Sequence, residues 1–251
     1  MTTGAARLPG ADGCVRWVRT WGTGAPVAYL HGLGCGNLAS WADTAARTGR
    51  PALFVDLVGH GLSDRPASFG YTLVEHADAV AAALSTVGAP VDVLAHSLGG
   101  SVAVVLADRH PHLVRSLVLV EPGLDPVAVE PGDLAAHSEA DLPHGGWDRL
   151  LSRETPERRA EVRTADPLAV VRSAVAICDA LGGTLNDVLA RTTVPTLLVA
   201  GFRTYDRWDA LRAAGVRCER VEGGGHFVML ERPEEFARLV QEFTTDVAGA
   251  A

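Results

Sequence analysis

The chain has 251 residues, of which 47% are hydrophobic and 21% are charged. This length and composition suit one large α/β domain with a buried core, and they argue against disorder along most of the chain. The net charge of −8 disfavours nucleic acids and anionic membrane surfaces as partners, because a basic patch would act against a repulsive background. All 22 basic residues are arginines, which excludes a lysine Schiff base, pyridoxal-phosphate attachment and a Walker-type phosphate loop.

No segment is expected to cross a membrane. The apolar, uncharged stretch at residues 93–107 is shorter than the roughly 18 to 20 apolar residues that a spanning helix needs. Residues 1–12 lack the apolar core of a signal peptide, so we expect a cytoplasmic protein. The cysteines are too scattered for a disulfide framework or a metal site; they are Cys14, Cys35, Cys178 and Cys218.

In chain order, short apolar runs alternate with helix-length amphipathic stretches. Strands are expected over residues 15–21, 27–30, 52–56, 91–95, 117–120 and 196–200, and helices over residues 38–46, 73–87, 98–109, 206–214 and 233–243. Because several strands are apolar on both faces, this order is typical of a mostly parallel sheet covered by helices on each side. Both termini are rich in alanine and glycine, and we expect them to fray.

The regular alternation stops between residues 122 and 190. An arginine- and glutamate-rich run over residues 153–163 and an apolar helix over residues 167–180 indicate a helical insertion. Ligands of open α/β sheets bind at the carboxyl ends of the strands, so such an insertion is expected to form a lid. We therefore predict a core made of residues 1–121 and 191–251, with a lid over residues 122–190. A surface elaboration without function is the alternative.

The sharpest motif lies at residues 91–100, Val-Asp-Val-Leu-Ala-His-Ser-Leu-Gly-Gly, where a buried strand turns into a helix. Ser97 lies at the bend, and Ala95 and Gly99 are small because strand and helix approach closely there. The motif resembles the nucleophile elbow of the α/β-hydrolase family, with Ala95 where glycine is usual. The resemblance implies an α/β-hydrolase fold, with the lid inserted after the strand ending at Val120, and Ser97 as the nucleophile.

Two further segments resemble the same family. The turn His31-Gly32-Leu33-Gly34 follows a strand, as in the family turn that gives one N–H to the oxyanion hole, so the resemblance implies the Leu33 and Leu98 N–H groups as the two donors. Residues 56–63 match the pattern D-x-x-G-x-G-x-S, which we interpret as a structural brace. Asp56, His60 and Asp64 are accordingly not assigned to catalysis. His31 is expected to hold its turn by a hydrogen bond.

A histidine late in the chain is expected as the general base. The glycine run Gly223-Gly224-Gly225 precedes His226 and lets the backbone bring the imidazole over the serine. Of the nine histidines, only His226 has this setting, so we predict it as the base; a structural role is the alternative.

The acid of the triad has two candidates. Family members usually place an aspartate shortly after the strand at residues 196–200, but Thr204 holds that offset and the nearest carboxylate is Asp206. A known variation uses the end of the preceding strand, where Glu121 directly follows Val120. We favour Glu121 and keep Asp206 open, because both satisfy the order serine, acid, histidine. Glu121 could instead cap a neighbouring loop, and Asp206 could cap the helix after it.

Together these motifs predict a serine hydrolase of the carboxylic ester class, EC 3.1.1. It would cleave an ester, lactone or thioester of a modest-sized, partly apolar small molecule through an acyl-enzyme on Ser97, with neither metal nor cofactor. A serine nucleophile argues against the haloalkane-dehalogenase and epoxide-hydrolase branches of the fold, which need a carboxylate at that position.

Specificity is expected to come from the lid and from residues 33–37 and 124–129. The predicted pocket residues are Gly32, Cys35, His96 and Phe227, although Cys35 is more simply read as a packed thiol. An arginine cluster in the insertion could attract an anionic substrate, but its interleaved glutamates favour a solvated helix face; the cluster is Arg149, Arg153, Arg158, Arg159 and Arg163.

Two other functions stay open. The same fold and triad can serve lyase, cyclase or carbon–carbon bond chemistry in a biosynthetic pathway, and a hydrolase scaffold can also act as a non-catalytic ligand-binding protein. Turnover of small esters with addition of water to the product would distinguish them. The oligomeric state is not indicated by any of these residues.

Overall fold

A computed structural model describes residues 1–125, 139–178, 184–203 and 205–250. Its centre is an eight-stranded sheet in the order β1-β2-β4-β3-β5-β6-β7-β8. The strands are β1 (Thr2–Arg7), β2 (Cys14–Arg19), β3 (Val27–Leu30), β4 (Ala52–Asp56), β5 (Val91–His96), β6 (Val114–Val120), β7 (Thr196–Ala200) and β8 (Arg217–Arg220). The pairs β1–β2 and β2–β4 are antiparallel, and all other neighbours are parallel. The carboxyl ends of β3 to β8 therefore lie along one edge of the sheet.

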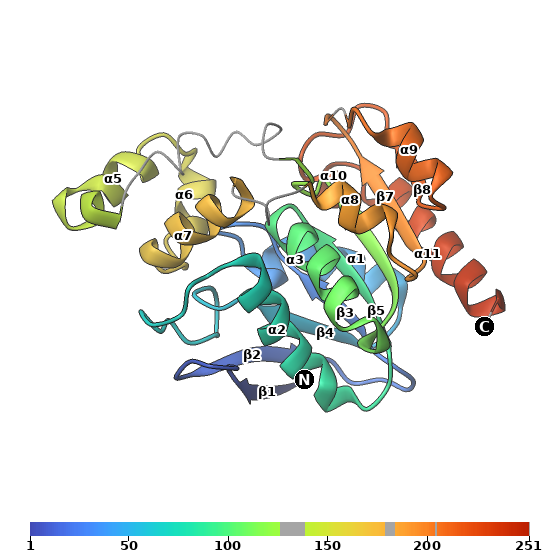
Figure 1. The fold of residues 1–251 in the computed structure, drawn as a ribbon, viewed down its shortest axis with the longest axis horizontal. Coiled ribbons are helices and arrows are strands. Elements are labelled where there is room, and N and C mark those ends of the chain that lie inside the picture. Colours follow the sequence, from blue (N-terminus) through green and yellow to red (C-terminus); the bar gives the residue numbers. More distant parts are fainter. Residues whose placement is uncertain (126–138, 179–183, 204, 251) are drawn as a thin grey trace.

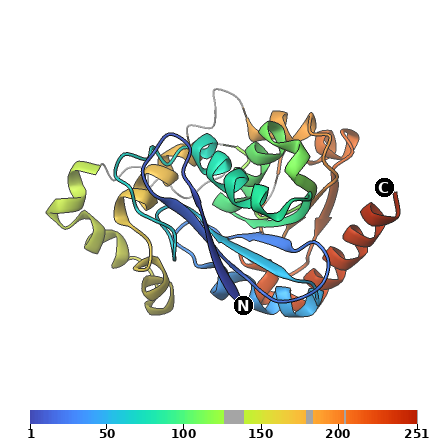
Figure 2. The same ribbon diagram turned by 90° about the horizontal axis from the view of Figure 1, so that it is seen from below.

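Helices cover both faces of this sheet (Figures 1 and 2). One face carries α1 (Asn37–Thr48), α10 (Val228–Glu231) and α11 (Pro233–Ala250). The other face carries α2 (Leu73–Leu84), α3 (Leu98–Arg109), α8 (Leu185–Ala190) and α9 (Trp208–Ala213). Short 3₁₀ helices are η1 (Ser85–Val87), η2 (Pro111–Leu113) and η4 (Glu139–His144). The predicted doubly covered, mostly parallel sheet is confirmed.

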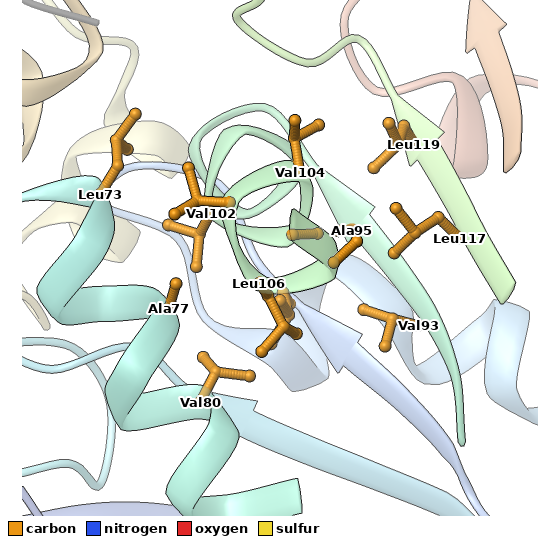
Figure 3. Packing of buried hydrophobic residues seen from close by; sticks show 14 of the residues in the cluster. Leu73, Ala77, Val80, Val93, Ala95, Val102, Val104, Leu106, Leu117 and Leu119 are labelled. Carbon is orange, nitrogen blue, oxygen red and sulfur yellow. The ribbon is translucent and has the colours of Figure 1, made fainter. Parts of the chain in front are cut away.

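Apolar side chains fill the space between the sheet and each helical layer. Figure 3 shows Val102 and Leu106 of α3 facing Ala77 and Val80 of α2, in the same cluster as Val93 of β5. On the opposite face the ring of Trp41 in α1 lies 5.6 Å from that of Tyr29 and 6.1 Å from that of Phe236. Each such buried side chain contributes about 1.5 to 3 kcal/mol to folding. Burial on both faces explains why the central strands are apolar almost without interruption.

Two strands were not predicted. β1 is a polar edge strand that pairs with β2 from Thr2 to Arg7, and β8 has the charged sequence Arg-Cys-Glu-Arg. Neither segment has the apolar alternation of a buried strand. Each is a strand because its backbone pairs with a neighbouring strand, and this pairing leaves no pattern in the side chains. The expectation that the termini fray is wrong: β1 is paired along its length and α11 continues to Ala250.

The helical insertion contains α5 (Gly146–Leu151), α6 (Pro156–Val162) and α7 (Pro167–Cys178), which lie beside the carboxyl edge of the sheet (Figure 1). Thr155 begins α6 by accepting the Arg158 N–H. The predicted lid range, residues 122–190, also includes residues 126–138 and 179–183, which lie outside the described residues. At its end, α8 packs against α3 and α9 beside the sheet.

Within the described ranges, none of the helices combines the length and the apolar character that crossing a membrane requires.

Candidate active site

Ser97 lies in a sharp turn between β5 and α3. Its backbone angles are φ 51° and ψ −118°, a region that residues with a side chain rarely adopt and that costs about 1 to 3 kcal/mol. The Ser97 N–H donates to the Val120 carbonyl at 3.0 Å, which ties the turn to the end of β6. Backbone strain at a serine on this edge of the sheet is typical of a reactive side chain held in a fixed direction.

Position 99 was predicted to need a small residue because strand and helix approach closely there. The structure gives a more specific cause. A Cβ atom on Gly99 would lie 2.5 Å from the His31 carbonyl oxygen and 2.8 Å from that of Leu30. The crowding therefore comes from the end of the neighbouring strand β3. Gly99 lets the start of α3 approach the loop that follows β3.

A cavity of about 370 Å³ lies between the sheet edge and the helical insertion, and both Ser97 and His226 line it. The sequence-predicted pocket residues line the same cavity; they are Gly32, Cys35, His96 and Phe227. The insertion contributes apolar side chains, which are Leu150, Val162, Val170 and Ile177. Residues 126–129, expected to contribute to specificity, lie outside the described residues.

His226 follows β8 and is held by its neighbours. The His96 Nε2–H donates to the His226 carbonyl at 2.9 Å, and the two ring centroids are 4.6 Å apart. Phe227 packs its ring edge against the His226 imidazole at 5.3 Å. His226 Nδ1 lies 3.9 Å from Glu121 Oε2, which is within ion-pair distance and longer than a hydrogen bond.

Glu121 is fully buried at the end of β6 and has a positive φ of 49°. Its Oε1 accepts three backbone N–H groups of the next loop: Gly201 at 2.5 Å, Phe202 at 3.1 Å and Arg203 at 3.3 Å. Its Oε2 faces His226 and also lies 3.2 Å from Arg203 Nε. One oxygen thus caps a neighbouring loop, as the structural alternative supposed, while the other approaches the imidazole.

Asp206 has a different environment. It is exposed in the turn before α9 and is not among the described residues that line the cavity. The N-cap of α9 is Arg207, without a side-chain cap, so the interpretation of Asp206 as a helix cap is wrong. The structure brings Glu121, and not Asp206, close to His226.

The loop after β3, residues 32–36 (the β3 loop), is held by two buried histidines. His31 Nε2 accepts the Leu57 N–H at 3.0 Å, so its Nδ1–H donates to the Gly32 carbonyl at 2.8 Å. His60 Nε2 accepts the Gly34 N–H at 3.1 Å. The expectation that His31 holds its turn by hydrogen bonding is confirmed, and His60 holds the same loop by a second hydrogen bond.

The carboxylates of the D-x-x-G-x-G-x-S segment also bind backbone and arginine groups. Asp56 Oδ2 accepts the Leu62 N–H at 2.9 Å, and Asp64 pairs with Arg16 at 2.9 Å. Both contacts fit the structural interpretation of this segment.

The interpretation of the arginine cluster as one solvated face is wrong for Arg158. Its side chain turns toward the β3 loop, lines the cavity and donates to the Cys35 Sγ at 3.0 Å, whereas Arg163 is exposed. The helical period alone could not show which arginine faces inward. Cys35 is 1% exposed, and burial raises the pKa of its thiol to about 11. Cys35 is thus a packed thiol that also borders the cavity.

Arg203 was not among the predicted site residues. It borders the cavity and contacts the Glu121 carboxylate through both its backbone and its guanidinium. The sequence signal for Arg203 was its position directly before Thr204, which holds the place where the family usually has the acid.

Buried neutral histidines make the fold sensitive to acid. Burial lowers the pKa values of His31, His60 and His96, and it lowers the pKa of His76 to about 3. Since these folded-state pKa values lie below the unfolded value of about 6.5, unfolding takes up protons, and stability falls as the pH drops below 6.5. Each such histidine adds a slope of about 1.4 kcal/mol per pH unit to the free energy of unfolding.

We therefore expect His76→Gln to reduce this slope by about one proton, measured by urea unfolding between pH 7.5 and 5. The exposed His112 supplies the control, because His112→Gln removes a histidine whose side chain is not buried by folding. An equal slope in the wild type and in both variants would contradict the assignment.

In the described parts of the chain, no cluster of three or more histidine, cysteine, aspartate or glutamate side chains is placed to hold a metal ion.

An eight-stranded, doubly covered sheet with a strained serine and a histidine at its carboxyl edge defines the α/β-hydrolase architecture. The model of the alpha/beta hydrolase family matches residues 27–239, and the chain belongs to this family. The resemblance noted from the Ser97 motif is confirmed, and with it the prediction of an α/β-fold hydrolase.

Proteins similar to this chain in sequence or in structure are named as esterases and lactonases. The chain is 32% identical over 252 residues to a pimeloyl-[acyl-carrier protein] methyl ester esterase of Neisseria meningitidis serogroup C, covering 88% of this chain and 94% of the relative. A solved N-acyl homoserine lactone degrading enzyme is 25% identical with a TM-score of 0.73, covering 96% of this chain and 100% of its own. An enol-lactonase from Burkholderia xenovorans LB400 has a TM-score of 0.77 at 22% identity, with coverages of 96% and 100%, and shows the same fold.

Proposed function

We propose that this protein is a serine hydrolase that cleaves a carboxylic ester, lactone or thioester through an acyl-enzyme on Ser97. The observation that carries the proposal is the cavity lined by both Ser97 and His226, with the buried Glu121 carboxylate 3.9 Å behind the imidazole. The esterase and lactonase relatives support the same reaction class.

Each group has one task in this mechanism. His226 takes the Ser97 proton as the hydroxyl oxygen attacks the substrate carbonyl carbon, and Glu121 orients the imidazole and stabilises its charged form. The N–H groups of Leu33 and Leu98 donate to the oxyanion. His226 then protonates the departing alkoxide or thiolate. Water attacks the acyl-enzyme by the reverse sequence and releases the acid.

The substrate is a modest-sized, partly apolar small molecule. The helical insertion acts as the lid and presents Leu150, Val162, Val170 and Ile177 to the cavity, which suits an aliphatic acyl or alcohol group. A cavity of about 370 Å³ lies at the small end of ligand sites, which favours short chains over long lipids.

The test is a fluorophosphonate label followed by a substrate panel. We expect the label on Ser97, and turnover of p-nitrophenyl acetate, p-nitrophenyl butyrate, aliphatic methyl esters or N-acyl homoserine lactones. In H₂¹⁸O the released acid should carry one ¹⁸O, since water resolves the acyl-enzyme. Labelling without turnover or ¹⁸O uptake would overturn hydrolysis and favour non-hydrolytic use of the same serine. Absence of both labelling and turnover would favour ligand binding.

A further inference from the structure

The lid helix α6 holds the β3 loop through side-chain contacts that the mechanism above does not use. Arg158 and Glu161 lie one turn apart on α6, and both reach the backbone of this loop. We propose that Arg158, supported by Glu161, is a positioning residue that holds the backbone of the β3 loop and thereby keeps the Leu33 N–H in place at the oxyanion hole. This inference rests on the proposed serine hydrolase function.

The β3 loop is a tight turn whose central peptide can point in two directions. The Cys35 N–H donates to the Gly32 carbonyl at 3.1 Å, and Gly34, the third residue of the turn, has a φ of +63°. A positive φ at that position belongs to type II turns, which differ from type I turns by a flip of the peptide between the two central residues. The direction of the Leu33–Gly34 peptide therefore fixes ψ of Leu33 and the path of the turn, and the Leu33 N–H, in the preceding peptide, keeps its place only while the backbone of this turn does.

Arg158 and His60 hold this peptide at its two ends. The Leu33 carbonyl accepts Arg158 Nη2–H of α6 at 2.5 Å. The Gly34 N–H donates to Nε2 of the buried His60 at 3.1 Å. A flip of the peptide would break both contacts at once. His60 belongs to the core, so Arg158 is the part of this clamp that the helical insertion supplies.

Glu161 makes the arginine contact specific. Its Oε1 accepts the Gly36 N–H at 3.1 Å, and its Oε2 accepts Arg158 Nη1–H at 2.9 Å. The same Nη1 donates to the Gly34 carbonyl at 3.3 Å and to Cys35 Sγ at 3.0 Å. Because Glu161 balances the charge and the loop occupies the guanidinium donors, Arg158 is suited to holding backbone rather than to binding an anionic substrate.

Packing presses α6 onto the same turn. A Cβ atom on Gly34 would lie 3.1 Å from Val162 Cγ2, next to the helix turn that carries Arg158. The β3 loop also touches the nucleophile elbow, since a Cβ atom on Gly32 would lie 3.2 Å from Ser97 Cβ. The loop is thus confined between α6 and Ser97, and a shift of its backbone displaces the donor from the reacting carbonyl.

The effect should appear in the transition state. Oxyanion donors act on charge that develops during attack, and losing one costs about 10²- to 10³-fold in kcat. A donor on a loop that is free to shift retains part of this effect, so we expect Arg158→Met to lower kcat about 10- to 100-fold while KM changes less than threefold. Arg158→Lys keeps the charge and one donor toward Leu33, and it should recover part of the loss.

The experiment compares these variants with Glu161→Leu, Glu161→Gln and the exposed control Arg163→Met. Rates on p-nitrophenyl butyrate are normalised to the fraction of Ser97 titrated by paraoxon, so that misfolded protein does not count. A butylboronic acid, which forms a tetrahedral adduct with the serine, should bind Arg158→Met more weakly by the factor lost in kcat. Butyramide, a neutral planar analogue that forms no tetrahedral oxyanion, should bind unchanged. Glu161→Gln keeps an acceptor and should exceed Glu161→Leu in kcat.

Each outcome is decisive. Unchanged normalised kcat in Arg158→Met, or a raised KM with unchanged kcat, overturns the positioning role and leaves the hydrolase function intact. If Arg158→Met does not fold, the ranking of Arg158→Lys and the two Glu161 variants decides in the same way. If the wild type cleaves none of the esters, the proposed hydrolase function is contradicted, independently of Arg158.

Discussion

Replacement of Ser97 by alanine is expected to lower kcat/KM on p-nitrophenyl butyrate by about 10⁴- to 10⁶-fold, because the acyl-enzyme can no longer form. The remaining rate would come from the oxyanion donors and substrate binding alone. Initial rates at high enzyme concentration measure the loss. Thermal melting should change little, since Ser97 occupies a strained conformation that a smaller side chain does not worsen.

Ser85→Ala is the matched control. Ser85 follows α2, and its hydroxyl binds the Ala81 carbonyl at 2.8 Å, away from the cavity. It should keep wild-type kcat/KM. More than about one part in a hundred of wild-type activity in Ser97→Ala would place the chemistry on another group.

Replacement of Glu121 by glutamine is expected to lower kcat about 10²- to 10⁴-fold, because the amide removes the negative charge that stabilises the imidazolium. The Gln side-chain oxygen can still accept the N–H groups of Gly201, Phe202 and Arg203, so the loop keeps its cap. The loss should therefore appear in kcat with the fold retained, as measured by steady-state kinetics and by thermal melting.

Asp206→Asn provides the comparison for the second candidate acid. Asp206 is exposed, and this variant should stay within about threefold of the wild type. The reverse result, a large loss in Asp206→Asn with Glu121→Gln near wild type, would transfer the role of the acid to Asp206. Similar, small effects of both variants would mean that His226 works without a carboxylate partner.

The local part of the fold was readable in the sequence. The ranges of β3, β4 and α3 match the predicted ones, because continuous apolar runs and helix-period apolar residues belong to elements buried on the sheet. The bend at Ser97 was also predicted from its Ser-x-Gly motif, although the contact that requires glycine at position 99 comes from the end of β3. β1 and β8 were not readable, because a polar strand is selected by the backbone of its neighbour.

The site required the assembled structure. The motifs, through their resemblance to the α/β-hydrolase family, supplied Ser97, His226 and two carboxylates in an order that both candidates satisfied, so the chain alone left the acid open. Parallel pairing of β5, β6 and β7 puts the residues after each strand at one edge, which brings Glu121 beside His226 and leaves Asp206 in solvent.

The direction of Arg158 also depended on the assembled structure. A helix of charged residues has the same pattern whether one arginine points to water or to a loop more than a hundred residues earlier. Local pattern determined the elements, the elbow and the chemical types available; contacts between distant segments decided which carboxylate and which arginine reach the site. The physical reason is that hydrophobic periodicity records burial, whereas the partner of a polar side chain depends on where the backbone carries it.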